Sequence, residues 1–344
     1  MHTHSLQTPV ARYGKLQVNP KTGYIYGSKT GAETPVQVKG VSFGWNMYPA
    51  SAPYFNAHTV HALVHNMKAE ILRAPMGYAS EWGYAQPENR NILMQRICTV
   101  VEAAISEGVY VIIDWHSHHA HLLPEAEIAR NYLQEMAQKY GKYDNVIFEI
   151  YNEPMFPNHT PSEYYRWETI KPYAEDAIAA IRRYSDNLVV VGTPYFSQQV
   201  GDVAGHEILD ANTAYVLHFY TYNHRLDAYT QNGTFREQIQ KALAAKLPLF
   251  VSEWGTTHSD GGQSENFNTH SVNNSNEWML WCDKHNISWC AWQMSHRPDE
   301  KSAWFNERGD VSALTELHKS DFNESGQYIW DKLETQFRAT HTKS

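Results

Sequence analysis

The chain has 344 residues, 42% apolar and 19% charged, so it can bury a large core and lacks the composition of a disordered protein. Its 28 basic and 37 acidic residues give a formal net charge of −9 without a basic run, which argues against nucleic acid as a partner. No apolar run approaches the roughly 20 residues of a membrane-spanning helix, so we expect no membrane association.

The N-terminal segment, residues 1–12, contains no apolar stretch like that of a signal peptide, and we expect it to be a disordered or tag-like tail. Residues 13–40 read as a short β-hairpin, because "NPKTG" at 19–23 supplies the residues of a tight turn. The hairpin precedes the first long strand and is expected to close the bottom of a barrel.

Eight short apolar runs rich in β-branched residues follow, and each ends in polar or aromatic residues. They occupy residues 36–43, 71–76, 109–116, 146–153, 188–192, 214–220, 249–254 and 288–294. Segments with helical spacing lie between them, at residues 91–108, 125–141, 162–184 and 235–246. Strands that alternate with helices over roughly 250 residues predict an α/β fold, a closed (β/α)8 TIM barrel.

An open doubly wound sheet fits less well, because no glycine-rich phosphate turn follows the first strand. No linker, internal repeat or low-complexity segment marks a second domain. We therefore expect a single catalytic domain at residues 13–338, followed by a short tail at 339–344.

Catalytic residues of such barrels come from the carboxyl ends of the strands. The chemistry-bearing residues at these ends are Arg73, His116, Asn152, Glu153, His218, Tyr220, Glu253 and Trp292. Two glutamates on different strands are the minimum equipment for glycoside hydrolysis, in which one protonates the leaving oxygen and the other attacks or activates water. The sequence therefore favours a glycosidase.

Three residues of the predicted strands could have a structural role instead of a catalytic one. Glu149 lies inside the fourth run, and we expect it to pair within the barrel. Arg73 could neutralise Glu149 as readily as serve the active site, and Trp292 taken alone reads as a core residue.

The histidines of "DWHSHHAH" at residues 114–121 could instead form a metal site. A metal-dependent hydrolase is therefore the main alternative to a glycosidase. Asp114 is the only acidic residue nearby, and we expect His118, His119 and His121 to lie in a solvated loop. The three cysteines, Cys98, Cys282 and Cys290, are too scattered for a zinc site and allow at most one disulfide.

Five motifs together resemble glycoside hydrolase family 5, a family of clan A, the retaining (β/α)8 hydrolases. They are "LRAPM" at 72–76, "DWH" at 114–116, "YNEP" at 151–154, "HFY" at 218–220 and "SEWG" at 252–255. The similarity extends from about residue 14 to residue 328, and it is strongest to the bacterial endo-β-1,4-glucanase (cellulase) branch.

The resemblance implies that Glu153 is the general acid/base and Glu253 the nucleophile. Asn152 would hold the 2-hydroxyl of the sugar being cleaved, and Arg73 and Tyr220 would orient Glu253 and favour its charged form.

In the same family pattern, His116 and His218 line the central subsite and Trp292 is its stacking floor. Tyr78 corresponds to a position that faces the non-reducing side. Arg297 and Glu300 fall near positions that bind more distant sugars.

The sequence departs from the family pattern at two places. A histidine common after the first strand is absent from "SFGWNMY", where Trp45 or Asn46 would replace its contact. A tryptophan common after the fifth strand is replaced by Tyr195 or Phe196, so stacking on the leaving-group side should be weaker.

These observations and the resemblance predict a monomeric endo-acting β-1,4-glucanase that works by double displacement without a cofactor. The resemblance also implies that the protein is secreted. Another β-glycan, such as mannan, xyloglucan, mixed-linkage glucan or chitosan, remains an alternative substrate, because the catalytic set does not read branching or the configuration at C2. A metal-dependent barrel hydrolase is a more distant alternative. A non-catalytic carbohydrate-binding barrel would need one of the two glutamates to be missing.

Overall fold

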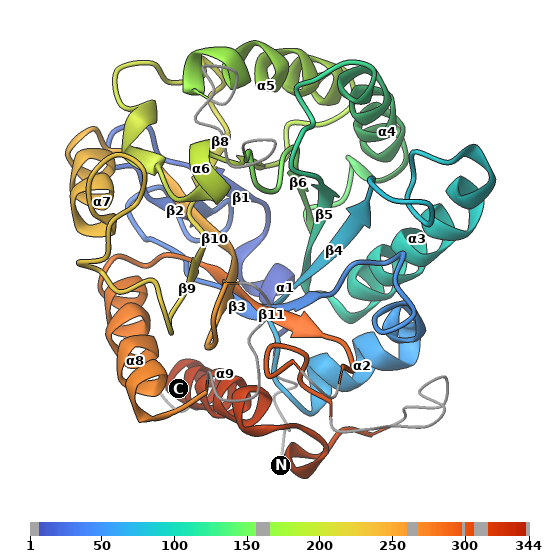
Figure 1. Cartoon of the computed structure of the whole chain (residues 1–344), viewed down its shortest axis with the longest axis vertical. Coiled ribbons are helices and arrows are strands. Elements are labelled where there is room, and N and C mark those ends of the chain that lie inside the picture. The colour runs from blue at the N-terminus through green and yellow to red at the C-terminus, as the bar shows by residue number, and fades with distance from the viewer. Residues whose placement is uncertain (1–6, 156–165, 260–266, 298–299, 306–315, 342–344) are drawn as a thin grey trace.

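The computed structural model describes residues 7–155, 166–259, 267–297, 300–305 and 316–341 (Figure 1). The strands after the N-terminal hairpin form one parallel sheet that closes on itself, because the last strand pairs with both β3 and β10. The strands are β3 (Lys39–Phe43), β4 (Ile71–Gly77), β5 (Tyr110–His116), β6 (Val146–Glu149), β7 (Val189–Val191), β8 (Thr213–Val216), β9 (Phe219–Tyr220), β10 (Leu249–Gly255) and β11 (Trp289–Met294). The predicted (β/α)8 barrel is confirmed.

The sixth strand position differs from the sequence-based expectation. The single run predicted at 214–220 is split into β8 and β9, and both pieces pair with β10. The strand in the fourth run is also shorter than predicted, since β6 ends at Glu149 and the four residues after it are not part of the strand.

Helices form a ring around the barrel in Figure 1. They are α2 (Ala57–His65), α3 (Arg90–Glu107), α4 (Glu125–Tyr140), α5 (Trp167–Arg182), α7 (Phe235–Ala244), α8 (Thr269–Lys284) and α9 (Glu324–His341). The four predicted helical segments correspond to α3, α4, α5 and α7, although residues 162–165 of the third lie outside the described residues.

The regular alternation is interrupted between β7 and β8. In place of a long helix, the chain forms the short α6 (Pro194–Ser197) and the 3-10 helix η5 (Val200–Val203). The remaining 3-10 helices with described bounds are η1 (Ala52–Tyr54), η2 (Pro87–Asn89) and η7 (Lys319–Asp321).

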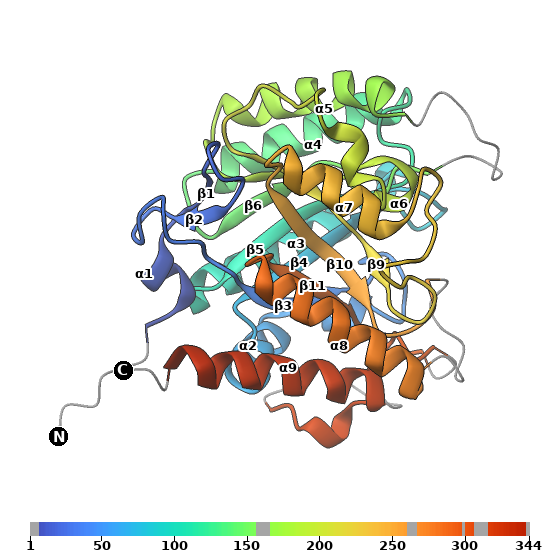
Figure 2. The same ribbon diagram turned by 90° about the vertical axis from the view of Figure 1, so that its left-hand side faces the viewer.

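The predicted N-terminal hairpin is present as β1 (Leu16–Val18) paired antiparallel with β2 (Ile25–Gly27). Its apolar side chains share one buried cluster with residues from the beginnings of the barrel strands, including Tyr110 and Ile147. Figure 2 shows the hairpin at one end of the barrel, where it covers the bottom as expected.

Both ends of the predicted catalytic domain differ from the structure. The segment expected to be disordered contains α1 (Pro9–Tyr13), because Thr8 caps this helix by accepting a hydrogen bond from the Ala11 amide and proline suits the first turn. At the other end α9 runs to His341, three residues past the predicted boundary at 338.

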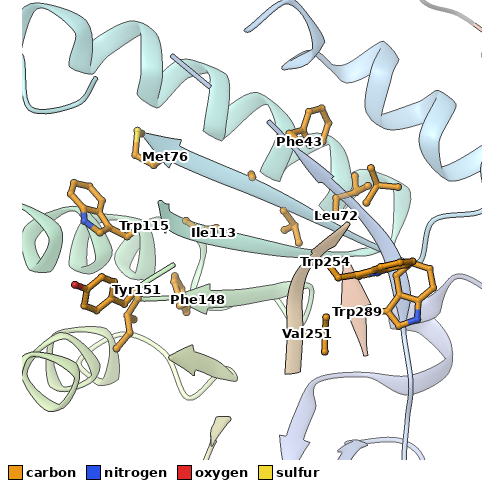
Figure 3. Close-up of a cluster of buried hydrophobic side chains, with 14 of the residues drawn as sticks. Phe43, Leu72, Met76, Ile113, Trp115, Phe148, Tyr151, Val251, Trp254 and Trp289 are labelled. Carbon is orange, nitrogen blue, oxygen red and sulfur yellow. The ribbon is translucent and has the colours of Figure 1, made fainter. Parts of the chain in front are cut away.

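The core lies between the barrel and the helices. Alternate strand residues such as Leu72, Met76, Ile113 and Phe148 point outward into this layer (Figure 3). Within the described residues, no helix is both long enough and apolar enough to span a membrane. All three cysteines are unbridged, so the disulfide that the sequence left open between Cys282 and Cys290 does not form.

Candidate active site

The alternation that buries one face of each strand sends polar side chains into the barrel. On β4, Leu72 and Ala74 pack toward the helices, so Arg73 between them points inward, where it is fully buried. On β5 the same rule places Asp114 and His116 inside. A polar layer therefore lies above the apolar bottom of the barrel.

A bulge in β10 adds two further residues to this layer. Val251 pairs with Trp289 and Trp254 with Ala291, so three steps on β10 match two on β11. Because of the extra residue, both Ser252 and Glu253 face inward, whereas strict alternation would send one of them toward the helices.

Arg73 connects the members of the polar layer. Its Nε donates to Glu149 Oε2 at 2.7 Å, and its Nη1 donates to Glu253 Oε2 at 2.7 Å. Its Nη2 donates to Asn152 Oδ1 at 2.7 Å and lies 3.0 Å from Asp114 Oδ2. The two readings of Arg73 that the sequence left open are therefore both correct at the level of contacts.

Glu253 is held as an anion. Burial alone would raise the pKa of its carboxyl, but Arg73, the two neighbouring histidines and the Tyr220 hydroxyl, which donates to Oε1, lower this pKa to about 2. An ionised carboxylate at the mouth of the barrel is the state that a nucleophile needs.

Glu153 is placed by the chain around it, although it lies beyond the end of β6. The Glu153 amide donates to the Ser117 carbonyl at 3.2 Å. On the other side, the Phe196 amide donates to the Pro154 carbonyl at 2.8 Å, and Ser197 Oγ donates to the Asn152 carbonyl at 2.7 Å. Loops after β5 and β7 thus fix the position of this glutamate.

A chain of hydrogen bonds leads from Glu153 to the bottom of the polar layer. Glu153 Oε1 lies 2.8 Å from His218 Nδ1, and His218 Nε2 lies 2.9 Å from Ser252 Oγ. Ser252 Oγ in turn donates to Glu149 Oε1 at 2.6 Å. Because the serine proton is directed at Glu149, Ser252 accepts a hydrogen bond from His218 Nε2. The unprotonated Nδ1 then accepts a hydrogen bond from the protonated carboxyl of Glu153.

The pKa values agree with this protonation pattern. Burial lowers the pKa of His218 to about 4, so its ring is neutral near pH 7. Burial and the charge of Glu253 raise the pKa of Glu153 to about 8, so Glu153 is protonated there. Two carboxyl groups whose pKa values are driven apart in this way suit an acid and a nucleophile.

Two further carboxyl groups of the polar layer, those of Asp114 and Glu149, share the guanidinium of Arg73. Burial, opposed by Arg73, raises the pKa of Asp114 and of Glu149 to about 7. Asp114 Oδ2 also lies 2.6 Å from His116 Nδ1, which fixes the orientation of that ring. Glu149 has the structural pairing that the sequence predicted.

The separation of the two glutamates determines what they can do. One carboxylate oxygen of Glu153 and one of Glu253 lie within 4.8 Å of each other. Retaining glycosidases hold their carboxyl groups about 5–5.5 Å apart, whereas inverting enzymes leave about 6.5–9.5 Å for a water molecule. The spacing fits direct attack on a sugar.

A cleft of about 770 Å³ lies over the pair. Most of the residues predicted for the site line it, namely Trp45, His116, Asn152, Glu153, Phe196, Tyr220, Glu253, Trp292, Arg297 and Glu300. Arg73 and His218 lie beneath it and hold the glutamates. Trp292 is therefore at the cleft surface, stacked on His116 at 5.3 Å between ring centroids.

Tyr78 is not among the cleft-lining residues, in contrast to the prediction. Its ring packs on Trp115, with centroids 5.4 Å apart. In the segment after β3, Trp45 takes the place at the cleft, and its ring meets His116 edge-on at 4.1 Å. Asn46 is buried and accepts from the Gly77 amide at 3.0 Å, so it is structural.

His118 lies in the loop after β5, as expected, and its side chain is partly exposed. It lines the cleft, and its Nδ1 lies 3.1 Å from the Glu153 carbonyl. Within the part of the chain that the structure describes, the histidines of residues 114–121 form no metal cluster. The groups with converging metal-ligand atoms there are Glu153–His218–Glu253 and a surface group on α2 and α3.

Several cleft residues carried no recognised signal in the sequence. They are Tyr48, Pro49, Ala50, Ser51, Trp82, Met155, Ser259 and Gln293. Among them, Trp82 is 49% exposed, and its ring meets Tyr48 edge-on.

Comparison with known proteins places these features in context. The sequence profile described as "Cellulase (glycosyl hydrolase family 5)" matches residues 29–298. Endoglucanase Z of Dickeya dadantii is 38% identical over 268 residues, which cover 77% of this chain and 57% of that protein. Endoglucanase A of Evansella cellulosilytica is 33% identical, covering 87% of this chain and 56% of that protein.

The chain thus spans little more than half the length of these relatives. Among solved structures, a protein from Cytophaga hutchinsonii aligns with a TM-score of 0.84 at 33% identity, covering 98% of this chain and 100% of that one. The catalytic domain of Thermobifida fusca endoglucanase Cel5A aligns with a TM-score of 0.78 at 27% identity, covering 95% and 100%.

Proposed function

Because the chain belongs to glycosyl hydrolase family 5, we propose that it is an endo-acting β-1,4-glucanase that hydrolyses its substrate by double displacement, with retention at the anomeric carbon. The observation that carries the proposal is the approach of Glu153 and Glu253 within 4.8 Å in one cleft, the former protonated and the latter ionised.

In the first step, Glu253 attacks the anomeric carbon and forms a glycosyl ester, while the bond to the leaving oxygen breaks. Glu153 gives its proton to that oxygen. In the second step, the ionised Glu153 takes a proton from water, the water oxygen attacks the anomeric carbon, and Glu253 leaves as a carboxylate.

The neighbours of the two glutamates support this chemistry. Arg73 and Tyr220 aim Glu253, each through one carboxylate oxygen. Asn152 receives its orientation from Arg73 and presents its amide group at the cleft, where it would donate to the 2-hydroxyl of the sugar being cleaved. A contact that strengthens as positive charge develops on the ring lowers the barrier rather than only KM.

The substrate assignment is supported by the relatives, which are named endoglucanases, and by the lining of the cleft. Trp292 offers a flat apolar face beside the glutamates. Tyr48 and Trp82 follow β3 and β4, whereas Phe196 follows β7, which is several strands away around the barrel. We therefore expect sugars to bind on both sides of the scissile bond. Occupation of both sides is the requirement for cutting within a chain.

A panel of soluble polysaccharides tests linkage and mode of action together. We expect carboxymethylcellulose to lose viscosity faster than reducing ends accumulate, with weaker activity on mannan, xyloglucan and chitosan. Preference for one of those polymers would replace the substrate assignment, and abolition of activity by a chelator would favour the metal-dependent alternative.

The roles of the glutamates are tested by azide rescue. Glu253→Ala should lose activity and regain it with azide as the inverted glycosyl azide, because azide attacks from the face that Glu253 vacates. Glu153→Ala should instead form the azide product with retained configuration. Rescue at neither position would contradict the roles.

We further propose that the protein acts as a monomer outside the cell. Glu153 and Glu253 and the residues that hold them, Arg73, His218 and Tyr220, belong to one chain. A polymeric glucan cannot cross a membrane, so its hydrolase has to meet it outside. Light scattering of the purified protein tests whether it is a monomer. Fractionation of the source culture tests whether it lies outside the cell.

A further inference from the structure

A cluster of metal-ligand side chains lies on the surface formed by α2 and α3. His61 and His65 are one helical turn apart on α2, so both project from the same face. Glu107, the last residue of α3, lies between them: its Oε1 is 2.8 Å from His61 Nδ1 and its Oε2 is 2.7 Å from His65 Nε2. The ligand atoms of the three residues lie within 4.8 Å of one another.

We propose that His61, His65 and Glu107 form a binding site for a first-row divalent metal ion of the Zn²⁺ type. Two imidazole nitrogens and a carboxylate are the ligand set of open tetrahedral zinc sites, in which bonds of about 2.0–2.2 Å leave the fourth position to water. The side chains of His61 and His65 are 54% and 53% exposed, so they are free to move apart slightly. A small expansion of the cluster is enough to admit the ion.

Proton balance presents no obstacle to binding. A neutral imidazole always keeps one nitrogen without a proton, so each ring can present a lone pair to the metal after a tautomer change. Glu107 supplies one carboxylate oxygen beside each of the two histidines. The carboxylate then cancels one of the two charges of the ion.

The site would link two helices that are adjacent in the ring around the barrel. Because α2 and α3 are brought together only in the folded chain, an ion that bridges them binds the native state and raises its stability by mass action. The cluster belongs to neither the catalytic cleft nor its polar layer. The expected role is structural, and it is independent of the proposed hydrolysis.

The experiment compares the Tm of wild type, of His61→Ala with His65→Ala, and of His58→Ala, each with and without Zn²⁺. The chain holds 19 histidines, and Glu153–His218–Glu253 can also approach a metal, so the difference between variants is the readout. His58 lies on α2, is exposed and is outside the cluster, which makes its variant the matched control. Substitution of Co²⁺ adds a visible absorption band that reports tetrahedral ligation.

We expect Zn²⁺ to raise the Tm of wild type and of His58→Ala by about 2 °C or more, and to leave the double variant unshifted. The strong Co²⁺ band should likewise be lost only in the double variant. Equal Tm shifts in all three proteins, or no shift in wild type, would overturn the proposal. If the double variant does not fold without metal, Glu107→Gln replaces it in the comparison, because glutamine keeps the shape of the side chain and removes the anionic ligand. Its Tm should then not rise with Zn²⁺.

Discussion

Arg73 Nη1 donates to Glu253 Oε2 at 2.7 Å, and the same guanidinium donates through Nε to Glu149 at 2.7 Å. One fully buried cation therefore holds the proposed nucleophile and a second carboxylate of the polar layer at the same time. The fork geometry of arginine makes this possible, because its donors point in several fixed directions.

Arg73→Lys should accordingly be severe despite conserving the charge. A single ammonium cannot reach Glu149, Asn152 and Glu253 together, so we expect kcat/KM to fall by about 100-fold or more and the Tm to decrease. Arg130→Lys, at an exposed ion pair with Asp176, is the matched control and should change neither quantity. Near-normal kcat/KM in the Arg73→Lys variant would refute this role for the guanidinium.

Glu153→Gln should discriminate between leaving groups. The amide cannot protonate the departing oxygen, so hydrolysis of cellobiosides with poor leaving groups should slow by about 100- to 10,000-fold, the scale of general acid catalysis. Aryl cellobiosides with strongly acidic phenols need no protonation and should lose much less in the first step. Equal losses across a series of phenols, measured by single-turnover kinetics, would argue against an acid at this position.

Ser252→Ala should move the basic limb of the pH profile. In wild type we expect kcat/KM to fall as pH rises through about 8, where Glu153 loses its proton. Without the serine hydroxyl, His218 can carry its proton on Nδ1 and donate to ionised Glu153, which favours the charged form. The limb should therefore shift to lower pH by about one unit.

A control separates this effect from general loss of stability. Ser185→Ala also removes a buried hydroxyl, one that donates to the Gly141 carbonyl far from the cleft, and should leave the limb unmoved. Ser252→Thr retains a hydroxyl and should restore most of the wild-type profile. An unchanged basic limb in Ser252→Ala would show that the hydrogen-bond chain does not set the protonation of Glu153.

Tyr220→Phe should move the acidic limb of the pH profile of kcat/KM. The tyrosine hydroxyl donates to ionised Glu253 and is one of the contributions that lower the pKa of that carboxyl. Its removal raises this pKa, so the nucleophile becomes protonated at a higher pH and activity on the acidic side is lost earlier. We expect a shift of about one unit in the acidic limb of kcat/KM. A shift toward lower pH would contradict the assignment.

The sequence was sufficient to place the two glutamates on one barrel edge, because period-two strands and motif residues are both visible in it. It could not show that both Ser252 and Glu253 face inward, since a bulge depends on pairing with β11 rather than on local residue type. The contribution of Ser252 to the site was missed for that reason.

The sequence did not place the side chains just beyond the strand ends. Tyr78 is the first residue after β4 and His118 the second after β5, and Tyr78 packs on Trp115 whereas His118 lines the cleft. Strand periodicity ends where the strand ends, so it gives no direction for side chains beyond that point. Their positions depend on tertiary contacts, such as the one between His118 and the Glu153 carbonyl.

The stereochemistry of the first product tests the central claim most directly. Proton NMR during early hydrolysis of a cello-oligosaccharide distinguishes the two anomers before they equilibrate. Because Glu153 and Glu253 approach within 4.8 Å, we predict that the β-anomer appears first and the α-anomer only later through mutarotation. Initial release of the α-anomer would contradict direct attack by Glu253.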